Sequence, residues 1–171
     1  GYQHALTSGS HVQLLMPLLG ETGCRIAEIA GLELNDIDMD AETIKIRPNS
    51  IRRLKTRTSN RTIPLVGYAK KAMTTALRHA SEQYLYPQYV QNGSCSATVA
   101  SNALGFWMKK EFGLTSHSLR HTFRDRLRNS HCPLELIDQI GGWSSVNNVG
   151  SSYGSGFHID NVREQLLKIA L

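Results

Sequence analysis

The segment His117-Ser118-Leu119-Arg120-His121 combines residue types that suit a phosphate group. If Ser116 caps a helix, His117 and Arg120 lie in its first turn, three residues apart and on one face. A helix N-terminus with a cation and an imidazole beside it can bind phosphate. His117 and His121 also have the four-residue spacing of helical zinc ligands, but no Glu follows His117 and no third ligand is evident. We therefore expect a phosphate site without a metal, and we interpret His121 as a core or capping histidine.

Reactive side chains occur in other segments too. Gly23 allows a tight turn from which Arg25 can begin a helix, and Glu28, one turn later, can hold the Arg25 guanidinium. Lys55 lies in a basic stretch, where a lysine on a flexible hairpin can enter a site and donate a proton. Tyr153 lies in a Gly- and Ser-rich stretch that core packing explains poorly, and its phenol is a weak nucleophile unless cations surround it. Taken singly, these are also consistent with a surface ion pair, a solvated lysine and an exposed loop tyrosine.

The basic residues are clustered along the chain. The 171 residues include 19 Lys and Arg against 14 Asp and Glu, a net charge of +5. The window 43–81 has no acidic residue, and a second basic group follows at 120–128. Such blocks create a positive potential that attracts a polyanion, although a solvated basic face is the alternative. The candidate DNA-contacting residues are Arg52, Arg53, Arg57, Arg61 and Arg124.

Composition excludes several classes of protein. The longest apolar run, 12–19, is eight residues, whereas a membrane-spanning helix needs about twenty. Three widely spaced cysteines without a CxxC motif argue against a disulfide framework and against a Cys-rich zinc site. We therefore expect no membrane association and a reducing, cytoplasmic compartment.

The elements that position these side chains follow from apolar periodicity. The pattern indicates a mainly helical α+β fold with one small three-stranded antiparallel sheet. The predicted helices span 10–19, 25–32, 68–81, 96–112, 116–129, 133–140 and 159–171, and the predicted strands span 36–39, 43–47 and 61–66.

The order of these segments resembles the tyrosine recombinases, the family that includes phage integrases. TGCRIAEIAGL (22–32) is similar to the family's first arginine box, and LKTRTSNRTIPL (54–65) to its lysine β-hairpin and the next strand. HSLRHTFRDRL (117–127) is similar to its His-x-x-Arg box. IGGW (140–143) and SSYG (151–154) match its His/Trp position and its nucleophile. The resemblance extends over residues 10–171.

The resemblance implies a site-specific DNA recombinase, or integrase, that breaks and rejoins strands. Tyr153 would attack the scissile phosphate, form a 3′-phosphotyrosyl bond and release a 5′-hydroxyl. Arg25 and Arg120 would clamp the non-bridging oxygens. His117 would hydrogen-bond the phosphate and accept the tyrosine proton.

The remaining matched residues have supporting roles by the same resemblance. Lys55 would protonate the leaving 5′-oxygen, and Glu28 would orient Arg25. Trp143 occupies the position where the family often has histidine, as a donor or as a packing prop. No cofactor is expected, because the phosphotyrosyl bond conserves the bond energy and the cations replace a metal.

The resemblance also implies partners and a location. The partners would be double-stranded DNA and other protomers in a tetrameric synapse, at the nucleoid in the cytoplasm of a bacterial host cell. Residues 1–171 would form a single catalytic domain, without the helical DNA-clamping domain that usually precedes it. Two other functions stay open: a type IB-like topoisomerase and a DNA-binding module with an inactive site.

Overall fold

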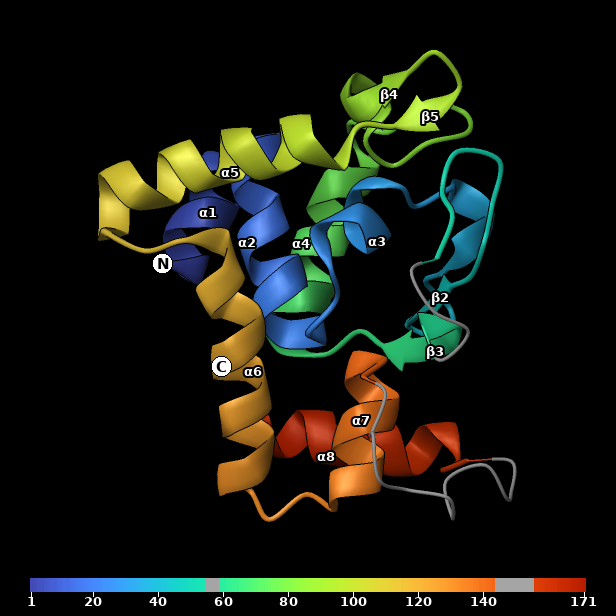
Figure 1. The fold of residues 1–171 in the computed structure, drawn as a ribbon, viewed down its shortest axis with the longest axis vertical. Coiled ribbons are helices and arrows are strands. Elements are labelled where there is room, and N and C mark those ends of the chain that lie inside the picture. The colour runs from blue at the N-terminus through green and yellow to red at the C-terminus, as the bar shows by residue number, and fades with distance from the viewer. Residues whose placement is uncertain (55–58, 144–155) are drawn as a thin grey trace.

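The computed structural model describes residues 1–54, 59–143 and 156–171 (Figure 1). In these ranges the helices are α1 (Tyr2–Ser8), α2 (His11–Thr22), α3 (Ile26–Ala30), α4 (Gly67–Leu77), α5 (Ala97–Phe112), α6 (Ser116–Asn129), α7 (Leu134–Gly141) and α8 (Ile159–Ile169). The strands are β1 (Ile37–Asp38), β2 (Thr43–Ile46), β3 (Arg61–Pro64), β4 (Val90–Gln91) and β5 (Ser94–Cys95), and short 3-10 turns cover Leu34–Asp36 and Pro87–Tyr89. The predicted fold class, mainly helical α+β, is confirmed.

A three-stranded antiparallel sheet has the order β1-β2-β3. Ile44 in β2 is opposite Ile37 on one side and Ile63 on the other. Successive side chains of a strand point to opposite faces, and Ile44, Ile46 and Ile63 are buried while Lys45 is exposed. This alternation confirms the predicted sheet, whose strands are shorter than the apolar pattern suggested.

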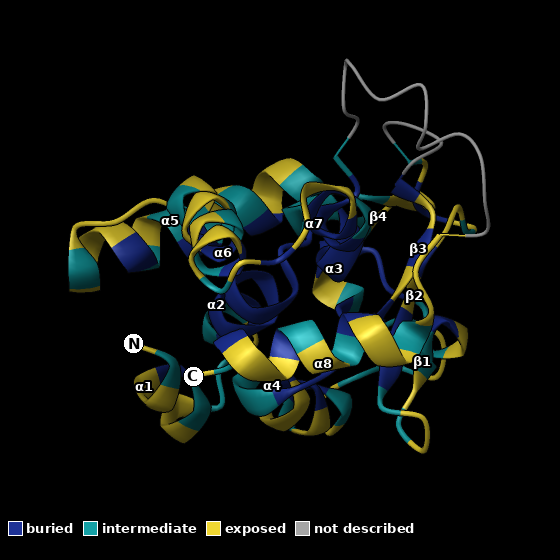
Figure 2. Ribbon diagram, turned by 90° about the horizontal axis from the view of Figure 1, so that it is seen from below, coloured by how far each residue is buried: buried dark blue, intermediate teal, exposed yellow. Residues whose placement is uncertain are grey.

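Helix α2 runs through the middle of the molecule and supplies much of the core (Figure 2). All residues from Leu14 to Thr22 are buried, and the helix packs against α1, α4, α5 and α6. Pro17 lies inside α2, but the helix continues to Thr22. The proline therefore does not end the helix, because tertiary packing on several sides outweighs the loss of one backbone hydrogen bond.

The turn after α2 brings the chain to the first functional side chain. Gly23 has a φ of 64°, a conformation that favours glycine. A Cβ atom at Gly23 would also lie 2.3 Å from the Phe123 ring of α6. The predicted tight turn is confirmed, and it places Arg25 at the N-cap of α3, next to α6.

Two elements were missed by the sequence analysis. Helix α1 has only seven residues, too few for a clear apolar period, and it packs closely on α2: a Cβ at Gly20 would lie 1.7 Å from the Tyr2 hydroxyl. The β4–β5 hairpin lies in a stretch that looked irregular. Its two turn residues, Asn92 and Gly93, both have positive φ. Asn-Gly is a strong sequence signal for such a hairpin turn, so this element was predictable.

Helix α8 packs on its own chain, against β3 and α6. Val162, Leu166 and Ile169 are its buried residues. Arg126 of α6 fixes its end by donating to the Ile169 carbonyl at 2.9 Å and to the buried Glu21 carboxylate at 2.7 Å. These contacts tie the segment after residue 156 to the core. None of the helices in the described ranges combines the length and apolar character that crossing a membrane requires.

Candidate active site

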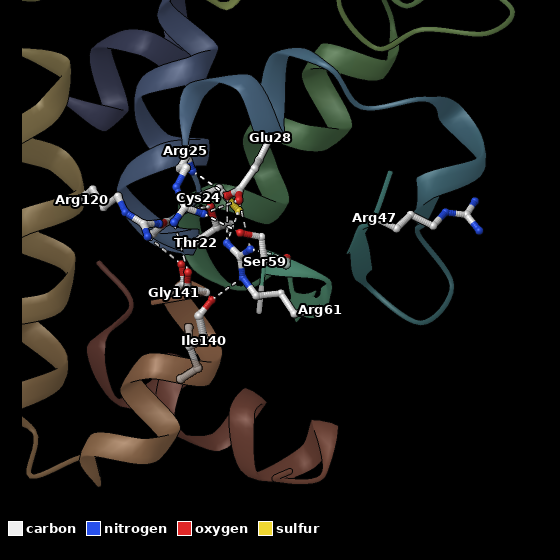
Figure 3. Close-up of polar contacts among 12 residues, drawn as sticks. Thr22, Cys24, Arg25, Glu28, Arg47, Ser59, Arg61, Arg120, Ile140 and Gly141 are labelled. Carbon is white, nitrogen blue, oxygen red and sulfur yellow. Dashed lines mark hydrogen bonds and ion pairs between the residues drawn. The ribbon is translucent and has the colours of Figure 1, made fainter. Parts of the chain in front are cut away.

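The C-terminus of α7 collects three arginine side chains from three other elements (Figure 3). Three consecutive carbonyls accept hydrogen bonds there. The carbonyl of residue 140 accepts from Arg61 Nε at 2.8 Å, and that of residue 141 accepts from Arg120 Nη2 at 2.7 Å. The carbonyl of residue 142 accepts from Arg25 Nη2 at 3.2 Å. The last carbonyls of a helix have no partner within the helix, and they carry the negative end of its dipole. The end of α7 therefore holds guanidiniums from α3, β3 and α6 in one place.

Glu28 is the carboxylate at the centre of this cluster. It is 3 % exposed, and it accepts from Arg61 Nη2 at 3.0 Å and from Arg25 Nη1 at 2.8 Å. The Arg25 backbone N–H donates to the same carboxylate at 2.8 Å. Burial favours the neutral acid, but the hydrogen bonds and charges of Arg61 and Arg25 outweigh burial and lower the pKa of Glu28. Glu28 is therefore ionised at neutral pH and fixes the direction of the Arg25 guanidinium.

Arg120 has only neutral hydrogen-bond acceptors in the described structure. Its guanidinium donates to the Gly23 carbonyl and, at 2.7 Å, to the Gly141 carbonyl. No carboxylate of the described residues forms an ion pair with it. Burial, with the charge of Arg25 nearby, lowers the pKa of Arg120 to about 10, so the group stays cationic at pH 7. A partly buried cation without a paired carboxylate favours the binding of an anion.

Trp143 covers one side of Arg120. The Arg120 Cζ atom lies 4.2 Å from the centre of the indole ring, and that of Arg124 lies 4.9 Å from it. The ring folds back over α7: a Cβ atom at Gly141 would lie 1.7 Å from ring atom Cζ3 of Trp143. The glycine at position 141 therefore makes room for an indole that packs against two guanidiniums.

His117 and His121 lie side by side on α6, which begins at Ser116 with Thr115 as its N-cap. Both histidines are exposed, and their ring centres are 4.6 Å apart. The interpretation of His121 as a core or capping residue is wrong, because its ring is exposed and contacts the ring of His117. His117 and Arg120 are three residues apart on α6, as the sequence predicted, so they share a face of the helix. In the described ranges no group of three or more His, Cys, Asp or Glu could hold a metal.

The sequence is similar to a known family of proteins and to several of its curated members. A family model with the description "Phage integrase family" matches residues 2–156. The chain belongs to the phage integrase family. Tyrosine recombinase XerC of Bacillus pumilus is 26 % identical over 152 residues, which cover 81 % of this chain and 48 % of XerC. A probable integrase/recombinase of Methanocaldococcus jannaschii is 28 % identical over 156 residues, which cover 83 % of this chain and 46 % of that protein. The chain therefore spans about half the length of the curated relatives it matches.

Solved structures of a recombinase and of a transposon integrase share the fold of this chain. XerA recombinase superposes with a TM-score of 0.66 at 21 % identity, covering 98 % of this chain and 59 % of XerA. The Tn1549 transposon integrase, in complex with transposon right-end DNA, superposes with a TM-score of 0.61 at 20 % identity, covering 99 % and 64 %. At these identities the likeness shows the fold alone.

The described ranges of this integrase-family chain contain most of the predicted site residues. The structure brings Arg25, Arg120, Trp143 and Glu28 together, and it places His117 on the same helix face as Arg120. The predicted proton donor Lys55, the nucleophile Tyr153 and the DNA-contacting Arg57 lie outside the described residues.

Two of the candidate DNA-contacting arginines are buried, although the charge pattern suggested that they face solvent. Arg52 is 4 % exposed and donates to the backbone carbonyls of Glu28 and Arg47. Arg61 is 9 % exposed and joins Glu28 to the end of α7. Their burial removes Arg52 and Arg61 from the candidate DNA-contacting set, because neither guanidinium faces solvent. Arg53 is exposed and stays in that set.

The sequence analysis did not predict that Arg61 joins Glu28 to the end of α7, or that Asp138 holds Arg124. A signal existed for Arg61, because alternation along β3 places residue 61 on the same inward face as Ile63, where a charged residue needs a partner. For Asp138 the local sequence holds no comparable signal. Its Oδ1 accepts from Arg124 Nη2 at 3.1 Å, a contact that depends on how α6 and α7 meet.

Proposed function

We propose that this protein breaks and rejoins DNA strands through a 3′-phosphotyrosyl intermediate, with Tyr153 as the nucleophile. One observation carries the proposal. The guanidiniums of Arg25 and Arg120, 95 residues apart in sequence, donate to the adjacent carbonyls of residues 142 and 141. Two cations held on adjacent carbonyls suit the two non-bridging oxygens of one phosphodiester.

The arginines stabilise the charge that develops during attack. A phosphodiester gains negative charge as it becomes five-coordinate, and donors fixed beforehand stabilise this charge without reorganising. Glu28 and the end of α7 hold the Arg25 guanidinium, while the carbonyls of residues 23 and 141 hold that of Arg120. Arg120 stabilises this charge strongly because no carboxylate of the described residues is paired with its guanidinium.

The other side chains move protons and exclude water. His117 hydrogen-bonds the phosphate and accepts the phenol proton as Tyr153 attacks. Lys55 gives a proton to the leaving 5′-oxygen. The rejoining step reverses these transfers: the 5′-hydroxyl attacks the phosphotyrosine, and the phenol leaves with a proton. Trp143 shields the Arg120 guanidinium from solvent and strengthens its interaction with the phosphate.

The attachment of the flanking segments to α7 supports Tyr153 as the nucleophile. On one side, the Trp143 N–H donates to the Asp138 carbonyl at 2.9 Å. On the other side, Phe157 exchanges two hydrogen bonds with Gln139, at 2.8 and 3.0 Å. Trp143 and Phe157, which flank Tyr153 in the sequence, are thus both held at the helix that gathers the arginines.

Double-stranded DNA is the proposed substrate, and residues 1–171 are proposed to act as a single catalytic domain. The Tn1549 integrase with the same fold has transposon DNA bound in its solved structure. The exposed Arg53, together with Arg57, supplies charge for phosphate contacts. We further propose that other protomers join on DNA in a tetrameric synapse, at the nucleoid of a bacterial cell.

A nicked suicide substrate tests this function. Cleavage next to the nick releases a short fragment, so a covalent protein–DNA adduct accumulates and is seen as a shifted band under denaturing conditions. We expect the adduct with the unaltered protein, none with Tyr153→Phe, and a severe loss with Arg25→Ala or Arg120→Ala. Arg128→Ala is the matched control, because this exposed arginine lies on α6 and pairs with Asp125. A chelator should have no effect.

The outcomes of this assay separate the alternatives. An adduct that persists in Tyr153→Phe would show that another residue is the nucleophile. Relaxation of any supercoiled plasmid, whatever its sequence, would indicate a topoisomerase. DNA binding without an adduct would indicate an inactive binding module.

A further inference from the structure

Asp138, in the last turn of α7, contacts Trp143 by two routes. Its backbone carbonyl accepts from the Trp143 N–H at 2.9 Å. Its carboxylate Oδ1 accepts from Arg124 Nη2 at 3.1 Å, and the Arg124 guanidinium lies 4.9 Å from the centre of the indole ring. One residue therefore fixes both the backbone of Trp143 and a cation that packs on its ring.

The same ring lies closer to the guanidinium of Arg120. Arg120 and Arg124 are four residues apart on α6, so they project from one face of the helix toward the indole. Their Cζ atoms lie 4.2 and 4.9 Å from the ring centre. A cation over the face of tryptophan is attracted by the ring quadrupole, more strongly where water is excluded. The ring thus connects Arg124, which has a carboxylate partner, to Arg120, which has none among the described residues.

The Asp138–Arg124 pair is too enclosed to be an ordinary surface ion pair. The side chain of Asp138 is 10 % exposed and that of Arg124 is 30 % exposed. Arg124 Nε is buried and has no hydrogen-bond partner in the described structure. Burial raises the pKa of Asp138, and the charge of Arg124 opposes that rise. By contrast, the side chains of Asp125 and Arg128, an ion pair within α6, are 65 % and 54 % exposed.

We propose that Asp138 and Arg124 are positioning residues, which hold the Trp143 indole in place. The indole in turn restricts the guanidinium of Arg120 to the direction set by the carbonyls of residues 23 and 141. This inference rests on the proposed strand-cleavage function, and it assigns to Arg124 a role other than DNA contact. Neither Asp138 nor Arg124 needs to touch the reacting atoms.

The two roles of Arg124 predict opposite effects of Asp138→Asn. This variant keeps the shape of the side chain but removes its charge, so a neutral amide oxygen holds Arg124 more weakly than the carboxylate does. If Arg124 mainly contacts DNA, this loosening leaves cleavage unchanged or raises it. If Arg124 and Asp138 position the indole, cleavage slows although DNA binds at least as tightly. The sign of the change therefore decides between the roles.

The rate of single-turnover cleavage of the nicked substrate, measured at saturating DNA, shows whether Asp138→Asn slows or speeds the reaction. We expect Asp138→Asn to be about 5- to 30-fold slower, the range that loss of one partly buried cation–π contact allows. Asp125→Asn, the same change in the exposed pair, should cleave at the normal rate. In a Trp143→Phe background, Asp138→Asn should slow cleavage no further, because both changes disturb the same contact, that of the indole with Arg120. A normal rate for Asp138→Asn, or effects that multiply, would overturn the proposal.

A second readout does not depend on cleavage. The chain has two tryptophans, so Trp107→Phe leaves Trp143 as the sole indole emitter. In that background, Asp138→Asn should increase quenching of the indole by acrylamide, whereas Asp125→Asn should not; circular dichroism checks that each variant folds. Unchanged quenching in a folded Asp138→Asn variant would overturn the positioning role. Increased quenching in a protein that forms no adduct would refute the proposed function and leave the positioning role intact.

Discussion

Replacing Glu28 by glutamine perturbs the charge at the centre of the arginine cluster. The carboxylate accepts from the Arg25 backbone N–H and from the guanidiniums of Arg25 and Arg61, at 2.8 to 3.2 Å. Glutamine has nearly the same shape, but only one of its two terminal atoms can accept. Its NH2 group would face a guanidinium donor, and two buried or half-buried cations would lose their counter-charge.

The expected loss of stability is large, because Glu28 is 3 % exposed and Arg61 is 9 % exposed. Removing one partner of a buried ion pair costs about 3 to 5 kcal/mol. For a domain of this size, each kcal/mol lowers the melting temperature by about 2 to 4 °C, so Glu28→Gln should melt about 6 to 20 °C lower at pH 7. Thermal unfolding followed by circular dichroism measures this shift. Glu164→Gln, which removes an exposed carboxylate paired with Lys168, is the control and should melt within about 2 °C of the unaltered protein.

The pH dependence of the shift provides the refuting test. The folded pKa of Glu28 is lowered, so its contribution to the free energy of unfolding is fully present above its unfolded pKa of about 4.3. That contribution is lost as the pH falls through the folded pKa. The difference between the two proteins should therefore be full at pH 6 to 7 and should shrink at strongly acidic pH. Equal melting temperatures at pH 7, or a gap that widens on acidification, would refute the assignment of Glu28 as an ionised partner.

Four other substitutions test separate parts of the structure. Gly141→Ala should raise helix propensity yet displace the Trp143 ring, so we expect adduct formation to fall about tenfold or more with a melting temperature changed by only a few degrees; normal cleavage would contradict the ring placement. Arg126→Met leaves a buried carboxylate unpaired, and we expect about 3 to 5 kcal/mol less stability and faster hydrogen exchange in α8; unchanged exchange there would contradict the anchor. Arg52→Met should lower the free energy of unfolding by about 3 kcal/mol, because Arg52 is buried, and the folded fraction should still bind DNA normally. Arg53→Met should leave stability unchanged, because Arg53 is exposed. It should reduce the slope of log binding constant against log salt concentration by about one, the loss of one phosphate contact. Equal effects of these two variants would contradict their different burial.

Elements with a regular apolar period could be predicted from the sequence. Helix α6 begins and ends at the predicted residues, 116 and 129, and β2 shows the alternation of inward isoleucines. These patterns succeed because burial on one face requires a fixed period. Helix α1 is too short to show such a period. The β4–β5 hairpin depends on positive φ at Asn92 and Gly93 rather than on any apolar pattern.

The basic cluster illustrates where sequence reasoning stops. Arg52 and Arg53 are neighbours in a stretch without acidic residues, and the charge pattern treats them alike. In the structure Arg52 is buried against the Arg47 and Glu28 carbonyls, whereas Arg53 is exposed. Which arginine turns inward depends on tertiary contacts, such as that of Arg52 with the carbonyl of Glu28, 24 residues away in the chain. A linear charge count therefore predicts that cations accumulate but cannot say which of them face solvent.

The partners of the arginines explain how like charges can be held together in a partly buried site. Within the described ranges, the guanidiniums of Arg25 and Arg61 share the one carboxylate of Glu28, and Arg120 has none. The carbonyls at the end of α7 supply partial negative charge to all three side chains, without a full anion that would bind them permanently. A second buried carboxylate would neutralise Arg120 and compete with a phosphate. Because backbone dipoles hold the cations while their net charge stays positive, the cluster is assembled before an anion arrives and is stabilised further when one binds.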